Sequence, residues 1–281
     1  MMPVDRCHFH NLLTKTGIPM TRTQLWLFTC ALLLSLAASA EKITVAAASD
    51  LKFAMDDIVA TFKKGHPGTE VDVVYGSSGN FNTQIQQGAP YDLFFSADIG
   101  FPRELAKNGL AASEVKPYAV GRIVLWSATL DASKMTLQNL ADPKITKIAI
   151  ANPKHAPYGK RAEEALRASG LWEKVEPKLV FGETIVQATQ FVQTGNAQAG
   201  IIALSLVTNP ELAKKGGYWL IPDTLHEPLE QGFIVTKHGE GSSLAKSFAD
   251  YMNTVPVRAV MTKYGFVLPG EAATAPATGK R

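Results

Sequence analysis

Short apolar runs and amphipathic segments follow one another along residues 41–268 of the sequence. The apolar runs are four or five residues long and are bounded by small or turn-forming residues, which is typical of buried strands. They occupy 43–47, 71–75, 93–96, 123–126, 147–151, 178–181, 199–203, 218–221 and 232–236.

Helical periodicity fills most of the intervals between these runs. The segment 50–64 shows it best, because its apolar residues share one helical face: Leu51, Met55, Ile58, Val59 and Phe62. Further helices are expected at 79–87, 102–107, 159–169, 184–194, 243–253 and 256–263. Strands that alternate with helices of this length predict an α/β fold with parallel sheets.

The alternating pattern occurs in two halves, over 41–121 and 122–228, and one more strand and two helices remain at 229–268. A chain whose last segment returns to its first half crosses twice between the halves. This is the arrangement of a two-lobe periplasmic binding protein fold, similar to type II, which closes about a hinge over a ligand cleft between the lobes. We therefore expect lobe 1 to comprise 41–121 plus 229–268 and lobe 2 to comprise 122–228. The Ala-, Thr- and Pro-rich tail at 269–281 is expected to be disordered.

The first forty residues have the pattern of a secretory signal. Arg22 precedes an apolar stretch at 25–36, and the small residues Ala38-Ser39-Ala40 follow it. We predict cleavage after Ala40, translation starting at Met20, and export to the periplasm. An uncleaved membrane anchor is the alternative.

The mature chain contains no cysteine, which excludes a disulfide framework, a thiolate metal site and a cysteine nucleophile.

Composition and charge exclude further classes of function. Hydrophobic residues make up 46% and charged residues 19% of the 281 residues, so a packed core can form. The formal net charge is +3 for the whole chain, and no run of five Lys or Arg exists, which argues against nucleic-acid binding. No histidine pair has metal-ligand spacing and no nucleotide-binding loop is present, so we expect neither a metal site nor a cofactor. We interpret His155 as a surface loop histidine near the cleft.

Four strand-to-helix turns carry the candidate chemistry. They contain Ala48-Ser49-Asp50, Gly76-Ser77-Ser78-Gly79, Pro157-Tyr158-Gly159 and Gly182-Glu183-Thr184-Ile185. In open α/β sheets a ligand binds beyond the carboxyl ends of the strands, where helix N-termini present unpaired N–H groups and partial positive charge. Two such turns from each lobe would form a site of neutral donors for a fully deprotonated oxyanion.

Alternative interpretations apply to individual residues of these turns. A serine before a helix is most often an N-cap, so Ser49 and Ser78 could serve only as caps. Asp50 would repel an anion, and we expect it to point away from the site, toward Lys52 or helix N–H groups.

The same turns resemble the ModA family of periplasmic molybdate-binding proteins. The resembling segments are ITVAAASDL, YGSSGN, QIQQGAPYDLFFSAD, ANPKHAPYG and KYGF, which together extend over about 41–268. The resemblance implies that an oxyanion is held by the hydroxyl groups of Ser49 and Ser78 and by the backbone N–H groups of Tyr158 and Ile185. Some members also have a tyrosine where this chain has Ala203. Ser205 or the Tyr158 phenol could replace that missing donor.

The resulting hypothesis is a monomeric, non-enzymatic binding protein that captures molybdate, and tungstate with it, and delivers it to the permease of an ABC importer in the inner membrane. Within the same class, the alternative is a binder of another oxyanion such as sulfate or phosphate. An exported hydrolase that uses Ser49 or Ser78 is more distant, because no base is evident in the sequence. A structural or adhesion module is the last alternative.

Overall fold

The computed structural model describes residues 41–271 and 278–279. The predicted signal peptide at 1–40 lies outside these residues, as does most of the tail at 269–281. Within that tail, Thr278–Gly279 forms a short strand, contrary to the expected disorder at these two positions. Among the described residues, no helix is long and apolar enough to cross a membrane.

The first sheet contains five strands in the order β2-β1-β3-β10-β4. β1 pairs in parallel with both β2 and β3, whereas β10 runs antiparallel to both β3 and β4. The strands span β1 (Lys42–Ala48), β2 (Glu70–Gly76), β3 (Leu93–Ser96), β4 (Lys116–Gly121) and β10 (Leu229–Val235).

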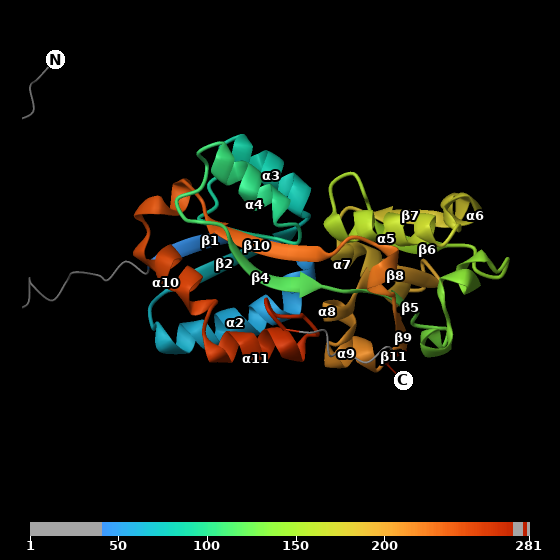
Figure 1. Cartoon of the computed structure of the whole chain (residues 1–281). Coiled ribbons are helices and arrows are strands. Elements are labelled where there is room, and N and C mark those ends of the chain that lie inside the picture. Colours follow the sequence, from blue (N-terminus) through green and yellow to red (C-terminus); the bar gives the residue numbers. More distant parts are fainter. Residues whose placement is uncertain (1–40, 272–277, 280–281) are drawn as a thin grey trace, which may run out of the picture. The chain divides into compact units, whose positions relative to one another are not determined.

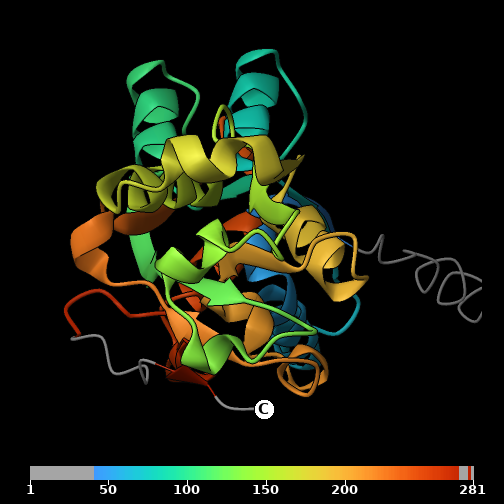
Figure 2. The same cartoon turned by 90° about the vertical axis from the view of Figure 1, so that its right-hand side faces the viewer.

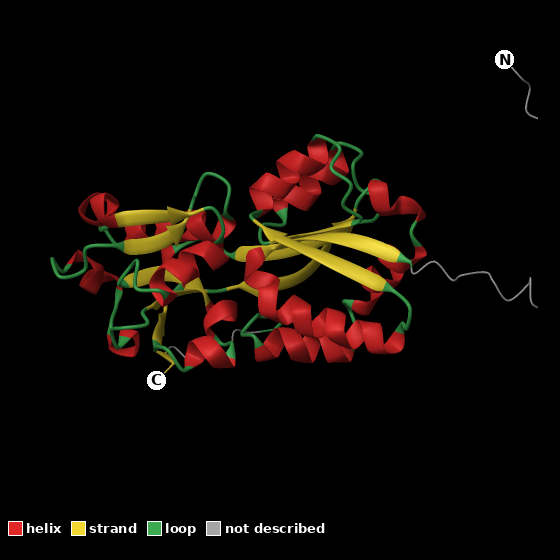
Figure 3. Ribbon diagram, turned by 180° about the vertical axis from the view of Figure 1, so that it is seen from behind, coloured by secondary structure: helices red, strands yellow, loops and turns green. Residues whose placement is uncertain are grey.

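Helices cover both faces of the first sheet (Figures 1 and 3). Successive residues of a strand point to opposite faces, so Val45 packs with one helical layer and Ala46 with the other. One layer contains the short helix η1 (Ser49–Leu51) with α2 (Lys52–Gly65), α10 (Ser243–Tyr251) and α11 (Val255–Lys263). The other contains α3 (Ser78–Gln86) and α4 (Gly100–Lys107), which lie side by side.

The second sheet has the strand order β11-β9-β5-β8-β6-β7 and its own hydrophobic core. Figure 2 views the described residues from the side on which this sheet lies. Its strands are β5 (Ile123–Trp126), β6 (Ile148–Ala151), β7 (Leu179–Gly182), β8 (Ala199–Ala203), β9 (Tyr218–Leu220) and β11 (Thr278–Gly279). The helices of this part are α5 (Pro157–Ala168), α6 (Trp172–Val175), α7 (Ile185–Gln193), α8 (Leu204–Val207) and α9 (Pro210–Ala213).

The α/β class is confirmed, and the parallel pairing expected from the sequence holds for β1 with β2 and β3 and for β6 with β7 and β8, but each sheet also contains antiparallel pairs. β10 is antiparallel to its neighbours in the first sheet, and β5 is antiparallel to β8 and β9 in the second. Both strands belong to the segments where the chain passes between the sheets, at Arg122 and again between β9 and β10. A strand that enters a sheet from the opposite end must run against its neighbours.

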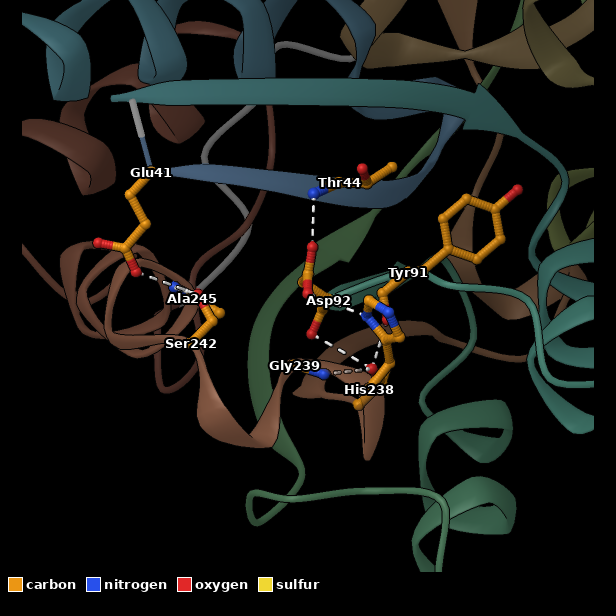
Figure 4. A network of polar contacts seen from close by, with 9 residues as sticks. Glu41, Thr44, Tyr91, Asp92, His238, Gly239, Ser242 and Ala245 are labelled. Atoms are coloured by element: carbon orange, nitrogen blue, oxygen red, sulfur yellow. Dashed lines mark hydrogen bonds and ion pairs between the residues drawn. The ribbon is translucent and has the colours of Figure 1, made fainter. Parts of the chain in front are cut away.

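A polar cluster closes the end of the first sheet at which β1 begins (Figure 4). The Asp92 carboxylate accepts a hydrogen bond from the Thr44 backbone N–H at 2.7 Å, and its other oxygen lies 3.1 Å from Nδ1 of His238. Nearby, the Glu41 carboxylate accepts from the Leu244 N–H at the start of α10 at 2.9 Å. These contacts join β1, β3 and the C-terminal segment, and thereby fix the sheet at the end opposite to the candidate site.

Candidate functional site

A small cavity lies where the turns that follow the strands of the two sheets meet. The lining contains all four sequence-predicted residues: Ser49, Ser78, Tyr158 and Ile185. The remaining lining residues are Ala48, Asp50, Gly76, Ser77, Ala97, Ala156 and Pro157. About 200 Å³ of space within the cavity, part of it open to solvent, is free of atoms, against about 890 Å³ in the groove beside Trp172 and Phe181. The cavity therefore suits a small ligand.

The first sheet contributes two serines at helix starts. Ser49 opens η1 directly after β1, and Ser78 is the first residue of α3 after β2. Ser49 is 3% exposed and Ser78 is fully buried. The Ser78 hydroxyl accepts a hydrogen bond from the Ala97 N–H at 3.0 Å, which fixes its oxygen and leaves its proton available as a donor.

The second sheet contributes two further helix starts. Pro157 is the first residue of α5 and has no N–H, so Tyr158 supplies the first backbone donor of that helix. Ile185 is the first residue of α7, and the Thr184 side chain caps Gln187 rather than Ile185. First-turn N–H groups have no partner within their own helix, so both residues can donate to a ligand.

The cap interpretation of the two serines is not what the structure shows. Neither η1 nor α3 has a side-chain cap hydrogen bond, and among the described residues no hydrogen bond involves the Ser49 hydroxyl. The hydrolase alternative needs a base beside Ser49 or Ser78. Within residues 41–271, no hydrogen bond joins either of these serines to a histidine.

Asp50 lines the cavity, so the expectation that it points away from the site toward Lys52 is wrong, whereas the expected contribution of helix N–H groups is present, from Asp50 and Leu51 of η1. Its Oδ2 atom accepts hydrogen bonds from the Tyr158 hydroxyl at 3.0 Å and from Gln231 Nε2 at 2.9 Å. Lys52 pairs with Asp56 instead, at 2.6 Å. Asp50 is 1% exposed, and its Oδ1 atom is buried without a hydrogen-bond partner among the described residues. The carboxyl group therefore stays buried beside the place where an anion would bind.

Burial dominates the protonation of this group. It raises the pKa of Asp50 to about 7, against smaller lowering contributions from Gln231, Tyr158 and backbone N–H groups. Burial, and then the charge of Asp50, raise the pKa of the Tyr158 phenol well above its ordinary value. The pKa of Tyr118 is raised for the same two main reasons. Both phenols consequently stay protonated near neutral pH.

His155 lies in a loop beside the cavity, as expected, but its ring is partly buried and connects the two sides of the cavity. Its Nδ1 atom lies 3.0 Å from the Ser77 hydroxyl, and its Nε2 atom lies 3.2 Å from the Glu183 carboxylate. Its carbonyl oxygen accepts from the Gly79 N–H at 3.0 Å. A Cβ atom at Gly79 would lie 2.7 Å from that oxygen, so only glycine permits this approach. Sequence reasoning missed this role because it depends on contacts across the cleft.

The two side chains considered as replacements for the tyrosine missing at Ala203 are engaged with Asp50. The Ser205 hydroxyl donates to the Asp50 carbonyl oxygen at 2.8 Å, and the Tyr158 hydroxyl donates to the Asp50 carboxylate. Ser205 is not among the residues that line the cavity, and neither is Ala203. The Tyr158 backbone remains available, because only its phenol makes these contacts.

The arrangement can bind a small oxyanion through hydrogen bonds from neutral groups. No Lys or Arg lies among the described residues that line the cavity, and Asp50 is the one carboxylate there. In the same part of the chain, no group of three or more His, Cys, Asp or Glu could ligate a metal ion. Larger grooves lie elsewhere on the surface, such as one beside Trp172 and Phe181, but none brings the four turns together.

Comparisons with known proteins agree with this chemistry. The family model for bacterial extracellular solute-binding proteins matches residues 43–267. The molybdate-binding protein ModA of Rhodobacter capsulatus is 38% identical over 83% of this chain and 91% of its own length. ModA of Azotobacter vinelandii is also 38% identical, over 84% and 94%. The solved structure of the periplasmic molybdate-binding protein from A. vinelandii matches with a TM-score of 0.76 and 31% identity, over 81% of this chain and 99% of that one.

Proposed function

Because the chain belongs to the bacterial extracellular solute-binding protein family, and within it to the ModA family of molybdate-binding proteins, we propose that it binds molybdate in the cavity described above. We propose tungstate as a second ligand, since it matches molybdate in charge, shape and size and would present its oxygens to the same donors. The family is one of solute-binding proteins, so we assign no catalytic reaction to the chain.

One observation carries this proposal. Four residues predicted from the sequence, Ser49, Ser78, Tyr158 and Ile185, line a single cavity, and each lies at the start of a helix that follows a strand. Each such start favours a nearby negative charge by about 0.3–1 kcal/mol when exposed and up to about 2 kcal/mol when partly buried. Together with two hydroxyl donors, they can offset much of the cost of removing a dianion from water.

The two sheets and their helices are proposed to act as two lobes, 41–121 plus 229–268 and 122–228. An anion that accepts hydrogen bonds from both lobes stabilises the closed form, because the open form lacks half of these contacts. We propose that the mature chain is a periplasmic monomer, released by cleavage of the signal at 1–40. Its closed form would deliver the anion to the permease of an ABC importer.

A titration of the purified protein with four oxyanions tests this function. Molybdate and tungstate should bind and raise the midpoint of thermal unfolding, because a ligand that binds only the folded state stabilises it. Sulfate and phosphate at equal concentration should have much smaller effects, because sulfate is smaller and phosphate retains a proton near neutral pH. Calorimetric binding of sulfate as tight as that of molybdate would contradict the proposal.

A further inference from the structure

The buried carboxyl group of Asp50 is the part of the cavity that the proposed function does not explain. Donors suit an anion, whereas an ionised carboxylate in the same lining repels it. The Asp50 side chain is held in place from both lobes by hydrogen bonds. One comes from Tyr158 of α5, beside the second sheet, and the other from Gln231 of β10, in the first. If the Asp50 side chain rotated out of the cavity, it would lose its hydrogen bonds from Tyr158 and Gln231. The negative charge of Asp50 can instead be neutralised in place by a proton.

We propose that Asp50 matches the charge of the cavity to its ligand by taking up one proton from solvent when the dianion binds. The proton joins a carboxylate oxygen and no other bond changes. This inference rests on the proposed molybdate-binding function and adds a coupled proton to it. It makes Asp50 the residue that favours a fully deprotonated ligand, since a neutral carboxyl group leaves only donors and neutral dipoles around the anion.

The geometry supports protonation of Asp50 in place. Its Oδ2 atom already accepts two hydrogen bonds, and the buried Oδ1 atom has no hydrogen-bond partner among the described residues, so Oδ1 can carry the proton without displacing a donor. Burial already holds the pKa of Asp50 at about 7 before any anion is considered. Two further negative charges nearby can only raise that pKa, so the anion-bound form stays protonated to higher pH than the free form.

The surroundings provide few other groups that could take up this proton. Tyr158 and Tyr118 face Asp50 from α5 and β4, and both are already protonated near neutral pH. On α2, Lys52 and Asp56 pair with each other, and the described residues of α7 and α8 include no charged side chain. Glu230 of β10 is exposed to solvent. His155 lies at the rim of the cavity, with its Nε2 atom 3.2 Å from the Glu183 carboxylate, and it is the control position in the test below.

Calorimetry of molybdate binding to the purified protein tests the inference. Titrations at pH 8 in two buffers of different ionisation enthalpy should show uptake of about one proton per anion. Between pH 7.5 and 9 the affinity should fall by about tenfold per pH unit, because the free form loses the proton that the bound form retains. Molybdate itself is fully deprotonated throughout this range.

Two variants test whether Asp50 or His155 takes up the proton. Asp50→Asn keeps the shape of the side chain and an oxygen for Tyr158 and Gln231, and it should bind with little dependence on pH and at least about tenfold more tightly than the wild type at pH 9. His155→Gln should retain the wild-type slope. Tight binding with no proton uptake in the wild type, a slope that survives in Asp50→Asn, or a slope that disappears in His155→Gln would each overturn the inference. Failure to bind molybdate at any pH would overturn the proposed function as well.

Discussion

Asp50 and Asp92 are two buried carboxylates of the first sheet, and they lie at opposite ends of it. Asp92 lies where β1 and β3 begin, and both of its oxygens have partners, the Thr44 N–H and His238 (Figure 4). Asp50 follows the end of β1, lines the cavity, and has one buried oxygen without a partner in the described part of the chain. A fully partnered carboxylate indicates a structural role, whereas an incompletely partnered one in a cavity indicates that a ligand or a proton completes it.

The largest effect expected from this comparison is a stability gain in Asp50→Asn. The pKa of Asp50 is raised from 3.8 in the unfolded chain to about 7 in the folded one. Between these values the folded state binds more protons than the unfolded state, so its free energy of unfolding falls as pH rises and the loss is complete above pH 7. The two values imply a cost of up to about 4 kcal/mol at pH 8.

Chemical denaturation of the ligand-free wild type and Asp50→Asn at pH 5 and pH 8 measures this cost. The variant should be the more stable of the two, and its advantage should increase by about 2–3 kcal/mol from pH 5 to pH 8. Effects of other titrating groups cancel in the difference between the two proteins. An advantage that stays constant with pH would mean that Asp50 is already ionised at pH 5, and the contrast between the two carboxylates would then fail.

Asp92→Ala should have the opposite consequence. It leaves the Thr44 N–H without its acceptor and removes the partner of His238, so the free energy of unfolding should fall by about 2–3 kcal/mol. Molybdate affinity, measured under conditions where the variant remains folded, should match that of the wild type, because Asp92 does not line the cavity. A variant of unchanged stability, or one with a large loss of affinity, would remove the distinction between the two ends of the sheet.

Ser49 and Ser242 allow the same comparison between the two ends of the first sheet, with a smaller expected effect on binding and stability. Ser49→Ala should weaken molybdate binding by about 1.5–3 kcal/mol, the range for a hydrogen bond to a charged group. It is preferred to Ser78→Ala, which would also leave the buried Ala97 N–H without an acceptor. Its matched control is Ser242→Ala. The Ser242 hydroxyl caps α10 at the other end of the sheet, where it accepts from the Ala245 N–H at 3.0 Å.

The control should lose about 1 kcal/mol of stability, as expected for a helix cap, and no molybdate affinity. Calorimetry and denaturation of both variants separate the two effects. If Ser49→Ala lost stability but retained affinity, Ser49 would be a structural cap and not a ligand-binding residue.

The sequence predicted most helices and strands of the fold, because apolar runs and helical periodicity depend only on residues that are close together in the chain. β3, β5 and β8 begin and end where the apolar runs do, and α10 and α11 differ from the expected helices by one or two residues. β4 was missed, since its sequence KPYAVG has no clear alternation and contains Pro117. The direction of β5 and β10 was also missed, because strand direction depends on where the chain re-enters a sheet.

The candidate site likewise has features that the sequence predicted and features that it did not. Turn chemistry and the family resemblance selected four residues that meet at one cavity. The surroundings of Asp50 could not be predicted, because its partners Tyr158 and Gln231 are 108 and 181 residues away in the sequence. The contacts of the His155 ring were missed for a related reason, since its contact with Ser77 spans 78 residues. Long-range burial changes the chemistry of a side chain without leaving a local signal.

A crystal structure of the protein with molybdate, with the molybdenum located by its anomalous scattering, tests the central claim most directly. The account predicts one molybdenum atom in the cavity, with its oxygens accepting hydrogen bonds from the hydroxyls of Ser49 and Ser78 and the N–H groups of Tyr158 and Ile185. A cavity that stays empty in the presence of molybdate, or an ion bound by Lys or Arg at another position, would contradict it.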